Sequence, residues 1–192
     1  MCFRKLLFIA VIVTFTCILW PGGSFTKASN ETSKTGDMSK FKEQIPRIPI
    51  SKTPFINEDG KKTNLHTHKG NWLLVNFWAT WCAPCIRELP YIYNLKQEMS
   101  TSKIKILLIS IDRSGSSMFQ PVLDKLKLKD LKSASDPKAA LMRSLQLSGV
   151  PTSLLIDPNG LIAGSLTGDA KWDSPRAIAL LNHYINEDLG AQ

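Results

Sequence analysis

The chain has 192 residues, 24 Lys and Arg against 16 Asp and Glu, a formal net charge of +8, and 43% hydrophobic residues. This length suffices for one well-buried domain after an apolar leader and is short for two. The basic residues are scattered and form no stripe interleaved with aromatic side chains, which argues against a nucleic-acid groove. A mildly basic solvated surface fits better, and it is compatible with an acidic partner or an anionic membrane.

Residues 1–22 are predicted to be a signal peptide or an N-terminal membrane anchor. Arg4 and Lys5 precede an uncharged apolar run over 6–20, and Pro21 ends it. A positive segment followed by such a run is typical of an export signal, either cleaved or retained. A buried core helix is the alternative, and it fits poorly because the run is apolar on every face. Residues 23–47 are rich in Ser, Thr, Lys, Gly and Asn, which predicts a flexible linker before a folded domain over 48–192.

Residues 54–65 are predicted to form a β-hairpin, because Asp59-Gly60 is a strong turn dipeptide. His66 and His68 follow in His-x-His spacing. With two cysteines downstream, this spacing leaves a metal site open. It does not match a common zinc finger, and histidines of a surface loop are the interpretation we favour.

A Cys-x-x-Cys motif, Cys82 to Cys85, lies between a compact apolar run over 72–78 and a segment of helical spacing that starts at Ile86. The run is expected to be a central strand buried on both faces. At a helix N-terminus, unpaired amides and the helix dipole favour the thiolate of the first cysteine, and the thiolate is the nucleophile. Cys2 and Cys17 lie in the leader. The folded part therefore contains one cysteine pair and no disulfide scaffold. At this point the pair is compatible with either redox chemistry or metal binding.

The remaining elements alternate between strands and helices. Residues 104–111 and 153–156 are expected to be strands, and a turn at 157–160 leads into a returning strand over 161–166. Helices are expected over 119–126, from Asp136-Pro137 and from Ser174-Pro175, the last two with a capping residue before a proline. This order predicts an α/β fold with a mixed sheet and helices on both faces.

Two motifs give the chain a resemblance to a known family. They are Asn76-Phe77-Trp78-Ala79-Thr80-Trp81-Cys82-Ala83-Pro84-Cys85 with Arg87-Glu88-Leu89-Pro90, and Val150-Pro151-Thr152 with Ile156-Asp157-Pro158-Asn159-Gly160. On these motifs, residues 48–192 resemble the thioredoxin superfamily, and within it the TlpA/ResA/CcmG-type membrane-tethered thiol–disulfide oxidoreductases. The ending, 168–181, leans toward TlpA. The resemblance implies a thioredoxin-like mixed β-sheet flanked by helices, with an added N-terminal β-hairpin and no cofactor.

The resemblance also implies roles for the two motifs. Cys82 would be the exposed attacking thiolate and Cys85 the resolving thiol, and the pair would form the redox disulfide. Pro151 would be cis and would face the cysteines, leaving the Val150 backbone open to a substrate chain. The remaining substrate-binding positions implied in this way are Trp81, Pro84 and Thr152. Core packing is the alternative for Trp81.

Asn76 stands where ordinary thioredoxin carries a buried carboxylate on the strand before the motif. An amide cannot accept or relay a proton. In ResA-like proteins an acid one turn after the second cysteine tunes the thiols, and the resemblance carries that role to Glu88. The alternative is a solvated glutamate paired with Arg87 or Lys96.

The expected activity is the reduction of disulfides in specific exported clients by a protein-disulfide reductase. By resemblance, the clients are apocytochrome c or the copper-site proteins of cytochrome oxidase assembly. The implied electron donor is a membrane protein of the DsbD or CcdA type. The expected location is the periplasmic face of the inner membrane, anchored or secreted, and the expected state is a monomer. A copper or zinc chaperone using Cys82, Cys85, His66 and His68, and a disulfide-forming oxidase, are the alternatives.

Overall fold

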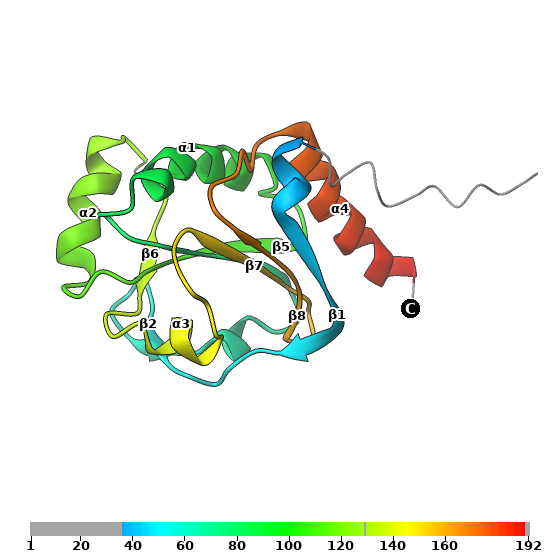
Figure 1. The fold of residues 1–192 in the computed structure, drawn as a ribbon, viewed down its shortest axis with the longest axis horizontal. Coiled ribbons are helices and arrows are strands. Elements are labelled where there is room, and N and C mark those ends of the chain that lie inside the picture. The colour runs from blue at the N-terminus through cyan, green and yellow to red at the C-terminus, as the bar shows by residue number, and fades with distance from the viewer. Residues whose placement is uncertain (1–35, 129, 191–192) are drawn as a thin grey trace, which may run out of the picture.

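The computed structural model describes residues 36–128 and 130–190. They form one eight-stranded mixed sheet in the order β1-β8-β7-β4-β5-β6-β2-β3 (Figure 1). The strands are β1 (Phe41–Pro49), β2 (Phe55–Ile56), β3 (Lys62–Thr63), β4 (Trp72–Trp78), β5 (Ile104–Ser110), β6 (Ser133–Ser135), β7 (Thr152–Ile156) and β8 (Leu161–Thr167). The helices are α1 (Ala83–Glu98), α2 (Ser116–Lys125), α3 (Ala140–Ser144) and α4 (Pro175–Gly190), with 3-10 turns η2 (Gly36–Lys40) and η3 (Leu65–His68). The expected thioredoxin-like α/β fold is confirmed.

The central strand β4 determines where the site can form. Every residue of β4 is buried, as its apolar run predicts. It pairs in parallel with β5 and antiparallel with β7, where Phe77 is opposite Thr152. The end of β4 and the start of β7 therefore lie side by side at one edge of the sheet, and α1 begins at that edge.

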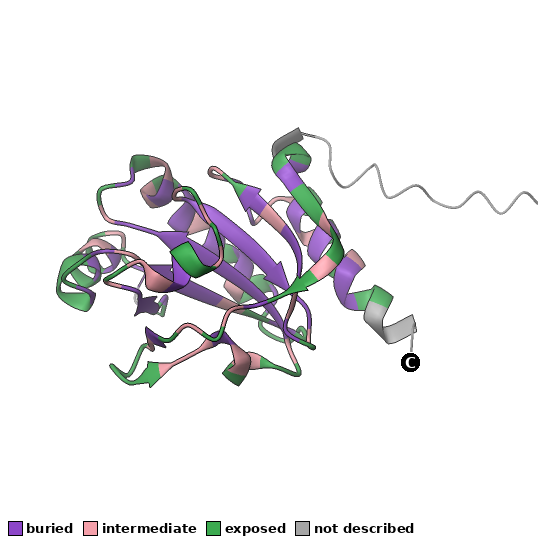
Figure 2. Ribbon diagram, turned by 60° about the horizontal axis from the view of Figure 1, so that its bottom comes forward, coloured by how far each residue is buried: buried purple, intermediate pink, exposed green. Residues whose placement is uncertain are grey.

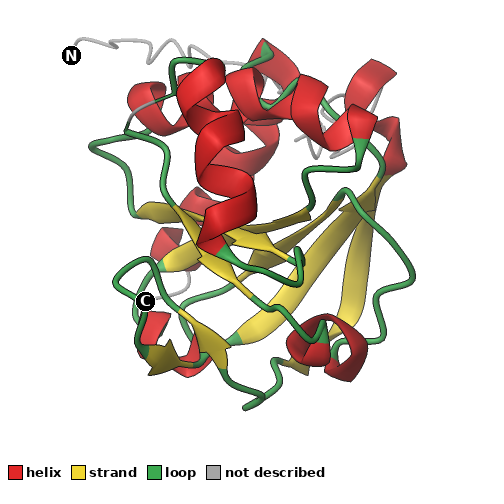
Figure 3. Ribbon diagram, turned by 90° about the vertical axis from the view of Figure 1, so that its left-hand side faces the viewer, coloured by secondary structure: helices red, strands yellow, loops and turns green. Residues whose placement is uncertain are grey.

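The side chains of β4 alternate between two hydrophobic cores, because successive residues of a strand point to opposite faces. Trp72, Leu74 and Trp78 pack with α1, α2 and α4. Leu73, Val75 and Phe77 pack with α3, η3 and the hairpin. Figure 2 shows the central strands of the sheet as buried and β1 as largely exposed, and Figure 3 shows helices on both sides of the sheet. The same alternation turns the polar Asn76 toward α1.

The predicted hairpin is present, with Phe55 opposite Thr63 and Ile56 opposite Lys62. Gly60 occupies its turn with a φ of 76°, a conformation that favours glycine. The prediction that Asp136 is the N-cap of the next-to-last helix is wrong, because Ala139 occupies that position, although the Asp136 carboxylate accepts the Ala140 N–H at 2.8 Å. The helix itself starts at Ala140 and not at Pro137, because Ala139 is left-handed with a φ of 48°.

The predicted flexible linker over 23–47 is wrong for its last part. Residues 36–40 form η2, and β1 pairs antiparallel with β8 from Phe41 opposite Leu166 to Pro49 opposite Leu161. The polar composition of this segment gives no strand signal, because β1 is an edge strand. It is held by backbone hydrogen bonds to β8 and by the buried side chains of Met38 and Phe41. Strand β6 was also not predicted, because it is only three residues long.

Among the residues that the structure describes, no helix is long and apolar enough to span a bilayer. The predicted signal peptide or anchor over 1–22, including Cys2 and Cys17, lies outside the described residues, as does the linker up to residue 35.

Candidate active site

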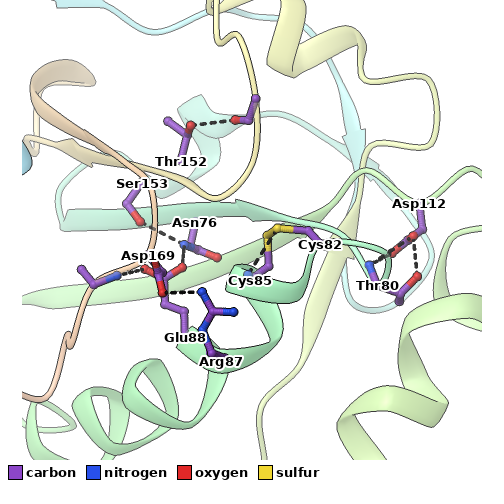
Figure 4. Close-up of a disulfide and its surroundings, with 12 residues drawn as sticks. Asn76, Thr80, Cys82, Cys85, Arg87, Glu88, Asp112, Thr152, Ser153 and Asp169 are labelled. Atoms are coloured by element: carbon purple, nitrogen blue, oxygen red, sulfur yellow. Dashed lines mark hydrogen bonds and ion pairs between the residues drawn. A yellow bond between two sulfur atoms is a disulfide. The ribbon is translucent and has the colours of Figure 1, made fainter.

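The two cysteines form a disulfide at the start of α1 (Figure 4). Cys82 is the N-cap of the helix, and its sulfur accepts the Cys85 N–H at 3.2 Å. The first turn of α1 contains no acidic residue, so the positive end of the helix dipole faces the Cys82 sulfur without local compensation. This arrangement stabilises a negative charge on Cys82 when the disulfide is opened.

Both sulfurs lie below the surface, and the neighbouring tryptophan does not. Cys82 is 5% exposed, Cys85 is 1% exposed and Trp81 is 69% exposed. The expectation of an exposed Cys82 is therefore wrong for the disulfide form, because its side chain turns inward over the helix start to reach Cys85. Core packing, the alternative for Trp81, is excluded by its exposure. Pro84, between the cysteines, is half-buried.

The loop before β7 lies at the same sheet edge. The Val150–Pro151 peptide bond is cis, as expected. The Pro151 carbonyl accepts the Gly168 N–H at 2.9 Å, and the Thr152 hydroxyl donates to the Gly149 carbonyl at 2.7 Å. Val150 is half-buried, and within 36–128 and 130–190 its backbone amide and carbonyl have no hydrogen-bond partner. The loop is thus braced on both sides of Val150, whose own polar backbone atoms are unused.

A buried carboxylate lies one turn after Cys85. Glu88 is 1% exposed. Its Oε1 accepts the Trp172 indole N–H at 2.7 Å and the Ala170 amide at 3.2 Å. Its Oε2 accepts an N–H of Asn76 at 3.0 Å, and the same Asn76 nitrogen donates to the Ser153 hydroxyl at 3.0 Å. Strand β4 and the segment before α4 therefore contact this acid directly, and β7 is linked to it through Asn76.

Burial decides the protonation of Glu88. Loss of solvation raises the pKa of its carboxyl to about 7 and outweighs the hydrogen bonds from Trp172, Asn76 and Ala170, which lower it. The nearby Asp169 charge also raises the pKa. At neutral pH both protonation states of Glu88 are accessible.

The alternative of a solvated Glu88 paired with a cation is excluded. Arg87 instead donates to the Asp169 carboxylate at 3.2 Å, on the exposed side of the helix. Lys96 donates to the Asp130 carbonyl at 3.0 Å. Since residues 87 and 88 are successive on α1, they point in different directions, and only Glu88 faces the core.

A model of the Redoxin family matches residues 33–181. This chain belongs to the Redoxin family. Among its curated relatives are proteins named thiol–disulfide oxidoreductase ResA. The protein of Bacillus thuringiensis subsp. konkukian is 28% identical over 168 residues, covering 86% of this chain and 90% of the relative. The ResA protein of Bacillus subtilis is 28% identical over 116 residues, covering 59% of this chain and 64% of the relative.

Solved structures share the fold of this Redoxin-family chain. A DsbE-type thiol:disulfide interchange protein of Chlorobium tepidum has a TM-score of 0.64 at 21% identity, with 72% of this chain and 96% of that chain covered. StoA of Bacillus subtilis has a TM-score of 0.50 at 26% identity, with 63% and 92% covered. The expected likeness to the TlpA/ResA/CcmG branch is confirmed, and so is the enzyme class, thiol–disulfide oxidoreductase.

In this Redoxin-family chain, His66 and His68 lie far from the two cysteines. His66 and His68 lie in η3, before the start of β4, whereas Cys82 and Cys85 follow its end. A seven-residue strand separates the two pairs by about 20 Å. The part of the chain that the structure describes contains no cluster of three or more His, Cys, Asp or Glu side chains placed to hold a metal ion. The four-ligand metal site considered from the sequence is therefore wrong.

Two contributors to the site were not predicted. Trp172 was noted only as part of the ending, and its N–H reaches Glu88 across 84 positions of sequence. Asp112 is buried and accepts the Thr80 amide at 3.0 Å and the Thr80 hydroxyl at 2.8 Å. This contact ties the loop before the cysteines to the end of β5. A polar residue directly after an apolar strand was the only sequence signal for Asp112.

Proposed function

We propose that this chain is a protein-disulfide reductase for specific exported clients and uses the Cys82/Cys85 dithiol. The observation that carries the proposal is a disulfide at the N-terminus of α1 with the buried carboxylate of Glu88 one helical turn behind it. The ResA names of the relatives support the chemistry.

The reaction is a balanced exchange of two electrons. In the reduced chain, the Cys82 thiolate attacks one sulfur of the client disulfide, and the other client sulfur leaves and takes up a proton. The Cys85 thiol loses its proton and attacks Cys82 in the mixed disulfide, which releases the second client thiol. The client disulfide is reduced to two thiols, and the chain is left with the Cys82–Cys85 disulfide. A dithiol donor must then reduce this bond again.

The acid behind Cys85 supports reduction over oxidation of clients, and it opposes the stabilisation of the Cys82 thiolate by the helix dipole. Strong oxidants of this chemistry stabilise their reduced form as a thiolate. Here the group behind Cys85 is an acid, and the cation next to it in sequence, Arg87, is paired with Asp169. An ionised Glu88 would raise the pKa of the Cys85 thiol by like-charge repulsion. When protonated it can supply the proton that a leaving thiolate needs.

The client chain is proposed to dock along the cysteine edge of the sheet. The free amide and carbonyl of Val150 would pair with an extended segment of the client, with Pro151 and Thr152 holding the loop. Trp81 and Pro84 would contact the client on the other side of the disulfide. The exposure of Trp81 supports this role.

The clients and the electron supply are proposed from the family resemblance. They are apocytochrome c or copper-site assembly proteins, and a membrane donor of the DsbD or CcdA type. The site would face the periplasm at the inner membrane, either tethered by residues 1–22 or released. The TlpA-like ending favours the copper-site clients over apocytochrome c.

The reduction potential of the Cys82–Cys85 pair tests the direction of electron flow. We expect equilibration with glutathione to give a value near that of thioredoxin, about −270 mV. A value close to about −120 mV, typical of strong oxidants, would replace the reductase with a disulfide-forming oxidase. Cys85→Ala is the companion variant, and it should accumulate a mixed disulfide with the client at Cys82.

A further inference from the structure

A groove opens beside Trp81, the residue that precedes Cys82, and is not used by the proposed chemistry. It has a volume of about 950 Å³, and exposed Trp81 is part of its lining. Its other walls come from the segment after β5, from α2 and from the segment that leads into α3. Because Trp81 directly precedes Cys82, the groove is within reach of residues that flank a client disulfide held at Cys82.

The charged lining of this groove is mostly basic. Arg113, Lys138 and Arg143 all line it, and none of them forms an ion pair within the described ranges. The guanidinium of Arg143 donates to the Lys138 carbonyl at 2.6 Å, which fixes it at the groove. The acidic residue in the lining is Asp112, whose carboxylate already accepts hydrogen bonds from Thr80 and Ser110.

Helix α2 follows Ser114 of the lining and contributes Met118 to it. Apolar contact is available from Met118, which is 48% exposed.

We propose that this groove binds an acidic segment next to the disulfide of the client protein. The inference rests on the proposed reductase function and adds a substrate class to it: clients whose disulfide is flanked by Asp or Glu together with an apolar residue. The carboxylates would pair with Arg113, Lys138 and Arg143, and the apolar side chain would lie between Trp81 and Met118. Such rim charges act chiefly on the association rate and on its salt dependence.

The test uses the reduced protein and two synthetic peptides that share one disulfide loop, one flanked by Asp and Glu and the other by Lys. We expect the acidic peptide to be reduced with a kcat/KM about tenfold higher at low salt, and the gap to shrink as salt rises. The triple variant Arg113→Gln, Lys138→Gln, Arg143→Gln should remove this preference. Met118→Ser should slow the reduction of both peptides when the peptides carry the apolar residue.

The matched control is Lys52→Gln, Lys103→Gln, Lys105→Gln, which removes the same charge from exposed positions outside the groove. It should keep the preference. Equal rates for the two peptides in the native chain would overturn the groove proposal, as would equal losses in both triple variants. Groove-dependent binding to anionic lipid vesicles without any peptide preference would also overturn it. Failure to reduce either peptide or a small-molecule disulfide would instead refute the reductase function itself.

Discussion

Two buried polar residues, Asn76 and Glu88, give the disulfide its chemical setting. Asn76 and Glu88 are each 1% exposed and hydrogen-bonded to each other. The Asn76 Oδ1 is buried and has no partner among the described residues, and Figure 4 shows it on the side of the amide toward Cys85. Because position 76 carries a neutral amide, the titrating group of this pair is Glu88, which lies one helical turn after Cys85.

Glu88 should make the stability of the protein fall as pH rises. Its pKa is about 7 in the folded chain against 4.5 in the unfolded chain, so between these values the folded state binds more protons. The free energy of unfolding should therefore fall by about 3 kcal/mol across this window, and Glu88→Gln should remove that fall. Urea unfolding at several pH values measures it.

The control for this prediction is Glu98→Gln, an exposed acid at the end of the same helix. It should keep the slope of the native protein. If Glu88→Gln and the native chain show parallel pH profiles, Glu88 does not titrate in this window. Glu88→Gln should also shift the pH dependence of thiol reactivity. If the pH profile of thiol reactivity is unchanged, Glu88 takes no part in the mechanism.

At the scale of elements, strand β1 closes the sheet next to β8 and depends on a close approach. A Cβ on Gly164 of β8 would lie 2.3 Å from the Phe41 ring. Phe41 also packs against Tyr184 of α4, with ring centroids 5.9 Å apart. The absence of a side chain at 164 thus allows β1 to bring its aromatic residue into the core between the sheet and α4.

Gly164→Ala should loosen β1. The added methyl group must displace the Phe41 ring, and overpacking of this kind costs about 1–3 kcal/mol. We expect a lower midpoint of chemical unfolding and faster hydrogen exchange over 41–49. Gly149→Ala serves as the comparison, because its Cβ would meet no atom within 4 Å. Equal effects of the two substitutions would show that the Phe41 contact is not the cause.

At the scale of the whole molecule, the folded unit starts earlier than its composition indicates. A chain that begins at Gly36 should keep the full stability of the described domain, whereas one that begins at Ile50 should lose several kcal/mol. Removal of η2 and β1 takes away buried Met38 and Phe41, each worth about 1.5–3 kcal/mol, and exposes the edge of β8. Thermal unfolding of the two truncated chains measures the difference, and equal melting temperatures would contradict it.

The sequence by itself determined the central features of the protein. The apolar run over 72–78, the Cys-x-x-Cys motif and the proline before the strand at 152 are local signals, because hydrophobic periodicity and capping act over a few residues. They sufficed to predict β4 and the start of α1, whereas the cis-proline loop and the redox disulfide were implied by the resemblance to the thioredoxin superfamily. The same resemblance placed Glu88 among the candidate residues.

Only the tertiary structure decided which of the open alternatives hold. Trp81 is a surface residue, His66 and His68 are a strand's length away from the cysteines, and Glu88 is a buried acid. Trp172 and the groove cations Arg113, Lys138 and Arg143 could not be placed from sequence, because they reach the site from separate segments. Strand β1 was missed for the same reason: its stability comes from pairing with β8, more than a hundred residues away.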